Sequence, residues 1–106
     1  MNIRIDSLVR EYKAGLEAIY GERLRGAYLY GSCARGEQDA ESDVDVVVVL
    51  DAVARYGAEV DRTGDLTSAV SLKYGLSISR VFVSQQDWMS GAPPFAAMAR
   101  AEAIPA

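Results

Sequence analysis

The segment from Asp43 to Leu50 constrains the fold of this chain more than any other part of the sequence. Five consecutive β-branched or aliphatic residues follow Asp45, which is a pattern typical of a β-strand. Successive side chains of a strand point to opposite faces, so apolar residues occupy both faces of this one. The sequence therefore predicts a central strand over residues 43–50 that is covered on both sides.

The other segments alternate between helix and strand. Helices are expected at 6–20, 32–37, 56–74, 84–91 and from 93 onward, and strands at 25–30 and 76–83. Gly57 and Gly64 are expected to break the helix over 56–74. The elements predict an α/β (α+β) fold class, in which three strands form a small mixed sheet packed with helices in a single domain over 1–106. The order and direction of the strands remain open.

Apolar residues at three- and four-residue spacing predict the buried side of each main helix. These positions are Leu8, Tyr12, Leu16, Ile19 and Tyr20 in the first helix, Val60, Leu66, Val70 and Leu72 in the central one, and Phe95, Met98 and Ala99 in the last.

The composition favours a folded cytoplasmic domain. Half of the 106 residues are apolar, which allows one core but not two lobes. Cys33 is the only cysteine and cannot form an internal disulfide; the N-terminus has no apolar stretch typical of a secretory signal. No apolar run approaches the roughly 18 residues of a membrane span. The net charge of −4 argues against a generic nucleic-acid binder, which usually has a basic face.

Two carboxylates stand at the start of the central strand. Asp43 and Asp45 are two residues apart, so in a strand they point to the same face with Cα atoms about 6.5 Å apart. Carboxylates that close repel each other unless a cation lies between them or one is protonated. Mg²⁺ binds through one or two carboxylates, several waters and substrate phosphates, so the pair predicts a magnesium site. The chain has no histidine, which excludes histidine ligands and a histidine base.

A glycine-serine turn precedes the carboxylates by ten residues. Gly31 permits a sharp turn and a close approach of backbone to ligand. A helix that starts just after it would direct N–H groups and the Ser32 hydroxyl at an anion. Arg35 could contact a phosphate, and Ser42 could orient the aspartates by hydrogen bonding. Each piece alone is weak, whereas their combination beside a buried strand predicts a site for a triphosphate and its metal.

Gly31-Ser32, ten residues and then Asp43-Val44-Asp45 resemble the signature of the DNA polymerase β-like nucleotidyltransferase superfamily. The residues around Arg35 and Ser42 are similar to those of its minimal nucleotidyltransferases. The resemblance implies transfer of a nucleoside monophosphate from a nucleoside triphosphate, most simply ATP, to a hydroxyl group. By position, Asp43 and Asp45 would be catalytic and would ligate Mg²⁺ or Mn²⁺, while Gly31 and Ser32 would hold the terminal phosphates. Arg35 would be an auxiliary phosphate contact.

Active members of that family have a third carboxylate on a neighbouring strand, and the expected strand at 76–83 contains no acid. Ser77 or Ser79 should occupy its position, and which of the two remains open. Arg80 alternates with both and is interpreted as a solvated edge residue in preference to a phosphate contact. Tyr30 could line the site or belong to the core.

Three functions remain open. The first is an active nucleotidyltransferase that modifies a protein or a small molecule. The second is a nucleotide-binding partner protein with little or no catalysis. The family resemblance suggests a HEPN-domain partner in a toxin–antitoxin pair, and a partner or self-association could supply the acceptor site that so small a domain lacks. The third is a stable fold with a vestigial site.

Overall fold

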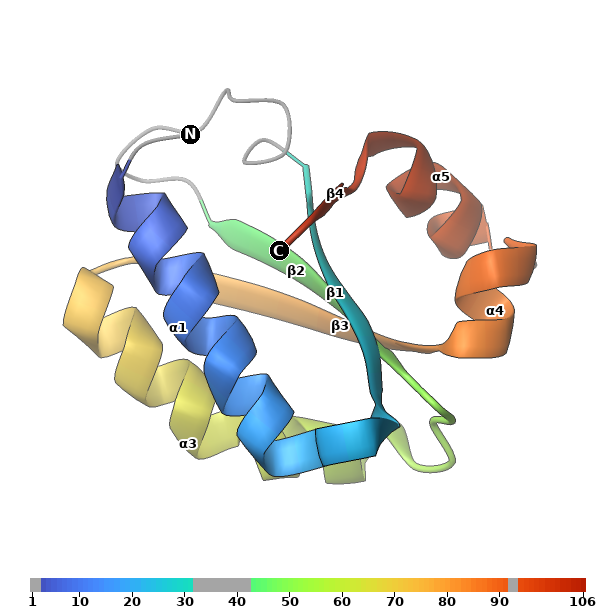
Figure 1. The fold of residues 1–106 in the computed structure, drawn as a ribbon, viewed down its shortest axis with the longest axis horizontal. Coiled ribbons are helices and arrows are strands. Elements are labelled where there is room, and N and C mark those ends of the chain that lie inside the picture. The colour runs from blue at the N-terminus through green and yellow to red at the C-terminus, as the bar shows by residue number, and fades with distance from the viewer. Residues whose placement is uncertain (1–2, 32–42, 92–93) are drawn as a thin grey trace.

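The computed structural model describes residues 3–31, 43–91 and 94–106 (Figure 1). In chain order, its elements are α1 (Ile3–Tyr20), the 3₁₀ turn η1 (Gly21–Arg23), β1 (Leu24–Tyr30), β2 (Val44–Leu50), α3 (Tyr56–Tyr74), β3 (Ile78–Ser84), α4 (Gln85–Ser90), α5 (Pro94–Glu102) and β4 (Ile104–Pro105). The predicted mixed α/β class is confirmed. The short helix expected at 32–37 falls outside the described residues.

The sheet has the order β3-β2-β1-β4 and is mixed. The second strand, β2, pairs antiparallel with β1 and parallel with β3, so it lies inside the sheet as its apolar run predicts. Six of its seven residues are buried, and Asp45 is the exception. The sheet separates α1 and α3 on one face from α4 and α5 on the other (Figure 1).

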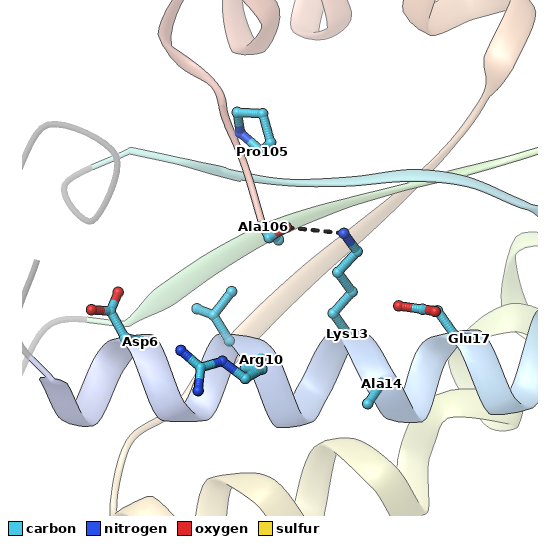
Figure 2. Close-up of a pocket in the computed structure, with 8 residues that line it drawn as sticks. Asp6, Arg10, Lys13, Ala14, Glu17, Pro105 and Ala106 are labelled. Carbon is cyan, nitrogen blue, oxygen red and sulfur yellow. Dashed lines mark hydrogen bonds between the residues drawn. The ribbon is translucent and has the colours of Figure 1, made fainter.

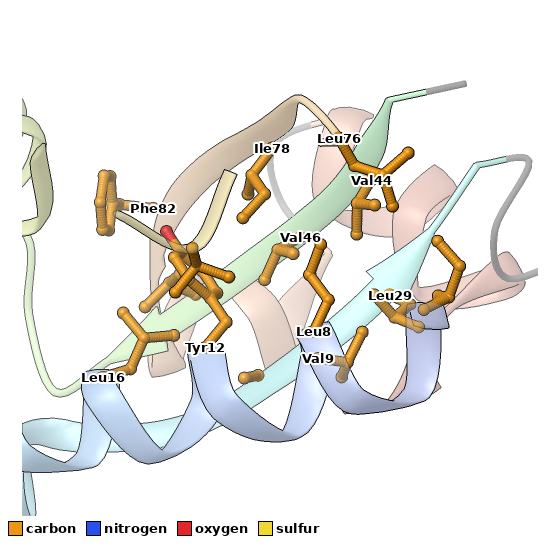
Figure 3. Close-up of a cluster of buried hydrophobic side chains, with 14 of the residues drawn as sticks. Leu8, Val9, Tyr12, Leu16, Leu29, Val44, Val46, Leu76, Ile78 and Phe82 are labelled. Atoms are coloured by element: carbon orange, nitrogen blue, oxygen red, sulfur yellow. The ribbon is translucent and has the colours of Figure 1, made fainter. Parts of the chain in front are cut away.

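The alternation of β2 divides its side chains between two hydrophobic clusters. Val44, Val46 and Val48 pack with α1 and α3, in the larger cluster shown in Figure 3. Val47 and Val49 pack with α4 and α5 in the smaller one. Because Asp45 has the same parity as Val47, its side chain belongs to the face that α4 and α5 cover.

The first helix begins earlier than its pattern suggests. It starts at Ile3, and Ile5 is buried against the core, so a further turn of apolar contact extends the helix beyond the expected Asp6. Ile19 was predicted on the buried side and is 37% exposed, which corrects that prediction. Tyr12 and Tyr20 continue the four-residue stripe and point into the protein, leaving Ile19 at its border.

The long helix α3 has the expected bounds but is continuous through Gly57 and Gly64. Its packing against α1 and β3 overrides the weak helix propensity of glycine there. Leu72, predicted as buried, is 84% exposed. The buried stripe consists of three polar side chains, Glu59, Thr63 and Thr67, together with Val70, which was predicted as buried.

The C-terminal segment adds a fourth strand that the sequence did not predict. The two residues of β4 pair with Tyr28 and Leu29 of β1, and so short a strand leaves no recognisable period. Helix α5 begins at Pro94, and position 93, from which it was expected, lies outside the described residues. On its predicted buried side Ala99 is buried and Phe95 is partly buried, whereas Met98 is 65% exposed and Ala96 is buried in its stead. None of the helices in the described ranges is long and apolar enough to cross a bilayer.

Candidate functional site

The two aspartates lie at the start of β2. Asp45 is the second residue of the strand, half-buried, and pairs with Tyr30 of β1 on one side and Ser79 of β3 on the other. Asp43 is exposed and immediately precedes the strand, which begins at Val44. The prediction that strand geometry orients both carboxylates therefore holds for Asp45 alone. The charge of Asp43 nonetheless acts on Asp45, so the two groups are neighbours.

Gly31 follows β1 directly and lies against the Asp45 carboxylate. Its φ of +70° is in the left-handed region, which favours glycine. A Cβ atom built on Gly31 would lie 2.7 Å from Oδ2 of Asp45, closer than van der Waals contact allows. Only a residue without a side chain leaves this carboxylate in place, so the turn and the carboxylate form one structural unit.

The environment of Asp45 disfavours its own negative charge. Burial raises the pKa of its carboxyl group, and the negative charge of Asp43 raises that pKa further. A bound cation would remove both penalties at once. Two neighbouring carboxylates are a donor set that suits Mg²⁺ or Mn²⁺, so the residues present fit a divalent metal. Within ranges 3–31, 43–91 and 94–106, no group of three acidic or thiol side chains gathers.

Three of the predicted site residues, Ser32, Arg35 and Ser42, lie outside the described residues, as does Cys33. The structure therefore brings together Gly31, Asp43 and Asp45. Ser79 is added to them, because it pairs with Asp45 in the parallel register. It is exposed and on the same face as Asp45, whereas Ser77 precedes β3 and its carbonyl oxygen accepts a hydrogen bond from Val44 N–H, so Ser79 is the serine that the register pairs with Asp45.

Arg80 belongs to neither of the environments predicted for it. Its Nε donates to Oγ1 of Thr63 at 2.7 Å, and its Nη2 donates to the carbonyl oxygen of Val60 at 2.9 Å. Strand alternation directs it away from Ser79 and towards α3. Arg80 therefore fixes α3 to the sheet, and it is neither a freely solvated edge residue nor a phosphate contact.

The structure places an aromatic pair beside Asp45, of which the sequence suggested only Tyr30. The ring of Tyr30 meets that of Phe95 edge-on, with centroids 5.6 Å apart at 85°. Burial raises the pKa of the Tyr30 hydroxyl, and the charge of Asp45 raises it further, which indicates that the two side chains are close. Tyr30 thus borders the site as well as the core. Its position directly before Gly31 was the only sequence signal for this role.

Two surface cavities lie along α1 and away from the aspartates. Figure 2 shows the first, of about 440 Å³, between α1 and the C-terminal segment. Lys13 crosses it and donates to the carbonyl oxygen of Ala106 at 3.1 Å. Lys13 and Glu17 also line the second cavity, which extends towards Gly26. Asp43 and Asp45 line neither cavity, so the two cavities are not part of the candidate site.

The described part of the site is thus a carboxylate at the start of a central strand, fitted against a glycine turn in a mixed sheet. The comparisons define the family. The chain belongs to the family described as "Polymerase beta, Nucleotidyltransferase", whose sequence model matches residues 17–88. The region matched includes Gly31, Asp43, Asp45 and Ser79.

Two relatives come from Methanocaldococcus jannaschii, and both are provisionally named protein adenylyltransferases. One is 31% identical over 81 residues, covering 76% of this chain and 75% of the relative. The other is 33% identical over 79 residues, covering 74% of this chain and 79% of the relative.

Solved structures share the fold. A protein described as a minimal nucleotidyltransferase, also provisionally, superimposes with a TM-score of 0.60 and 25% identity, covering 95% of this chain and 94% of that one. A chain from a toxin–antitoxin crystal structure with AMP-PNP superimposes with a TM-score of 0.64 and 19% identity, covering 89% of this chain and 68% of that one. The second similarity is one of fold alone.

Proposed function

We propose that this protein is a cytoplasmic, metal-dependent nucleotidyltransferase that moves AMP from ATP to a hydroxyl group of a protein or small molecule. The observation that carries the proposal is the fit of Gly31 against the Asp45 carboxylate. It puts a turn that can approach a phosphate beside a carboxylate whose charge needs a cation. The family and the names of the two relatives support the same reaction.

Asp43 and Asp45 would hold the divalent ion, Mg²⁺ or Mn²⁺. The ion would neutralise the phosphate charge that develops as the α-phosphorus is attacked. Strand β2 holds Asp45 rigidly, and Gly31 leaves open the space at its Oδ2 side. The terminal phosphates would lie along the turn after β1, where Ser32, Arg35 and Ser42 remain the predicted contacts. The acceptor oxygen forms a bond to the α-phosphorus, the bond to the leaving pyrophosphate breaks, and the hydroxyl proton passes to solvent.

The serine beside Asp45 favours a second candidate, a nucleotide-binding partner protein with little catalysis. Ser79 is uncharged and cannot replace a third carboxylate as metal ligand or base. Binding through Asp43 and Asp45 would persist, whereas activation of the acceptor would be weak. The toxin–antitoxin neighbour supports a role beside a partner protein, for which we propose a HEPN-domain toxin. Such a partner, or self-association, would supply the acceptor surface.

Incubation with α-labelled ATP, Mg²⁺ or Mn²⁺ and candidate partner proteins tests the proposal. Transfer of label that disappears in Asp43→Ala and Asp45→Ala supports the enzyme. Metal-dependent ATP binding without transfer in any mixture supports the second candidate. If millimolar ATP and metal produce no binding, both are wrong and the site is vestigial.

A further inference from the structure

A small cavity opens next to Gly31, between the end of β1 and α5. It has a volume of about 240 Å³ and is lined by Tyr30, Gly31, Phe95, Met98, Ala99 and Glu102. Gly31 therefore has the cavity on one side and the Asp45 carboxylate on another. Helix α5 lies beyond residues 17–88, so the family match does not account for this wall.

The walls of the cavity are suited to a flat aromatic group. Tyr30 and Phe95 present ring surfaces at 85° to each other, and Ala99 forms a small buried floor. Met98 lines the same cavity and is 65% exposed, whereas the core side of α5 is formed by buried alanines. An exposed, adaptable thioether beside aromatic rings is a common feature of ligand sites. The cavity is about the size of one ring system and too small for a drug-sized ligand, for which pockets of about 300–1,000 Å³ are typical.

The charges around the cavity decide which part of a nucleotide fits. Glu102 places a carboxylate at its edge, which repels phosphate groups and can accept hydrogen bonds from N–H donors. This repulsion would keep the phosphates of a bound nucleotide at the Gly31 turn and the divalent ion. Nucleobases have apolar faces that stack on aromatic side chains and amino groups at their edge. We propose that this cavity binds the base of the nucleoside triphosphate, with Tyr30, Phe95 and Met98 against the ring. This inference rests on the proposed function of the Asp45 site.

A binding comparison between ATP and inorganic tripolyphosphate tests the inference, because tripolyphosphate has the phosphates without the base. With Mg²⁺ present, Phe95→Leu should weaken ATP binding about tenfold, the order expected for losing one stacking partner. Met98→Ala should act in the same direction without disturbing the core. Neither variant should change tripolyphosphate binding. Met89→Ala is the matched control, since Met89 is 62% exposed on neighbouring α4 and does not line the cavity.

Methyl NMR gives a second readout that does not depend on affinity. The chain has three methionines, so ¹³C-methyl labelling gives few signals. ATP should shift the Met98 methyl through the ring current of the base, whereas tripolyphosphate should not, and Met89 should respond to neither ligand.

The outcomes separate the two proposals. If Phe95→Leu and Met98→Ala weaken the binding of ATP and of tripolyphosphate equally, or leave ATP binding unchanged, the base binds elsewhere. Either result would leave the proposed Asp45 site intact. A wild-type protein that binds tripolyphosphate as tightly as ATP would also overturn the base cavity. If the wild type binds neither ligand, the proposed function fails and the base cavity fails with it.

Discussion

Gly31 is the residue at which backbone conformation and candidate chemistry coincide. Alanine there would combine a positive φ with a Cβ 2.7 Å from Oδ2 of Asp45, so the carboxylate would have to move. We expect Gly31→Ala to lose about 1 kcal/mol of stability and to abolish metal-dependent ATP binding. Calorimetric titration and urea unfolding of the same samples measure both effects.

Gly75→Ala is a close control for this change. Gly75 has a φ of +66° at the end of α3, but a Cβ there would meet no atom within 4 Å. It should lose similar stability and keep ATP binding. If both variants bind ATP as the wild type does, contact between residue 31 and Asp45 has no role in the site.

Ser79 is the position from which a third carboxylate would reach the site. Its pairing with Asp45 and its exposure predict that Ser79→Asp places an acid beside the existing pair without burying a charge. An added base and metal ligand should raise AMP transfer about 100-fold, the low end of general-base effects, which are about 10²–10⁴. The measurement is label transfer to the acceptor. A similar gain in Ser79→Asn would rule out the carboxylate as its cause.

Among the elements, α3 is fixed to the rest of the fold by a buried carboxylate. Glu59 is 4% exposed and accepts hydrogen bonds from the Tyr20 hydroxyl at 2.8 Å and Arg23 Nη2 at 3.0 Å, and Arg62 adds an ion pair. Burial by itself would raise the pKa of Glu59, but the hydrogen bonds from Tyr20 and Arg23 outweigh it and keep the pKa below the ordinary 4.5. The charged form therefore stabilises the fold.

The lowered pKa of Glu59 determines how its contribution to the free energy of unfolding depends on pH. The contribution of Glu59 is fully present above the pKa of the unfolded chain and is lost as the pH falls through the lower, folded-state pKa. Glu59→Gln should lower the free energy of unfolding by about 2 kcal/mol at pH 7. The variant and the wild type should converge in acid. Urea unfolding of both proteins from pH 7 to pH 3 measures this convergence, and Asp61→Asn, at an exposed position of the same helix, is the control. A difference in the free energy of unfolding that stays constant across this range would contradict a stabilising charge on Glu59.

Elements with strong periodicity could be predicted from the sequence, and elements that depend on distant contacts could not. The apolar run of β2 fixes its central place because both faces need cover. The polar stripe of α3 could not be predicted, because the buried Thr63 accepts a hydrogen bond from Arg80 of β3, a residue of another element. The same bond explains why the interpretation of Arg80 as a solvated edge residue is wrong. Strand β4 depends on β1 for its existence and has no pattern of its own.

At the site, the sequence could predict the residue types but not their surroundings. Gly31 and Asp45 stand out by spacing, since a turn and a strand end carry local signals. That Asp45 would be half-buried beside Ser79 depends on the register of β2 and β3, which local sequence does not encode. The wall formed by Phe95 depends on how α5 packs against β1, and α5 is far from both β1 and β2 in the sequence.

Over the whole molecule, the two helical layers have different tasks. Helices α1 and α3 cover the larger hydrophobic cluster, whereas α4 and α5 cover the face that carries Asp45 (Figures 1 and 3). The stabilising core is thus separated from the candidate site by the sheet. The arrangement allows Asp45 to be changed at little cost to folding, and relief of the charge penalty at Asp45 should keep Asp45→Asn at least as stable as the wild type.

Calorimetric titration of ATP into the wild type and Asp45→Asn, each with Mg²⁺ and with EDTA, tests whether Asp45 holds a metal–nucleotide complex. We expect binding by the wild type only when Mg²⁺ is present and no binding by Asp45→Asn, with both proteins folded. ATP binding that is equal in the two proteins, or unchanged by EDTA, would contradict a metal–nucleotide site at Asp45.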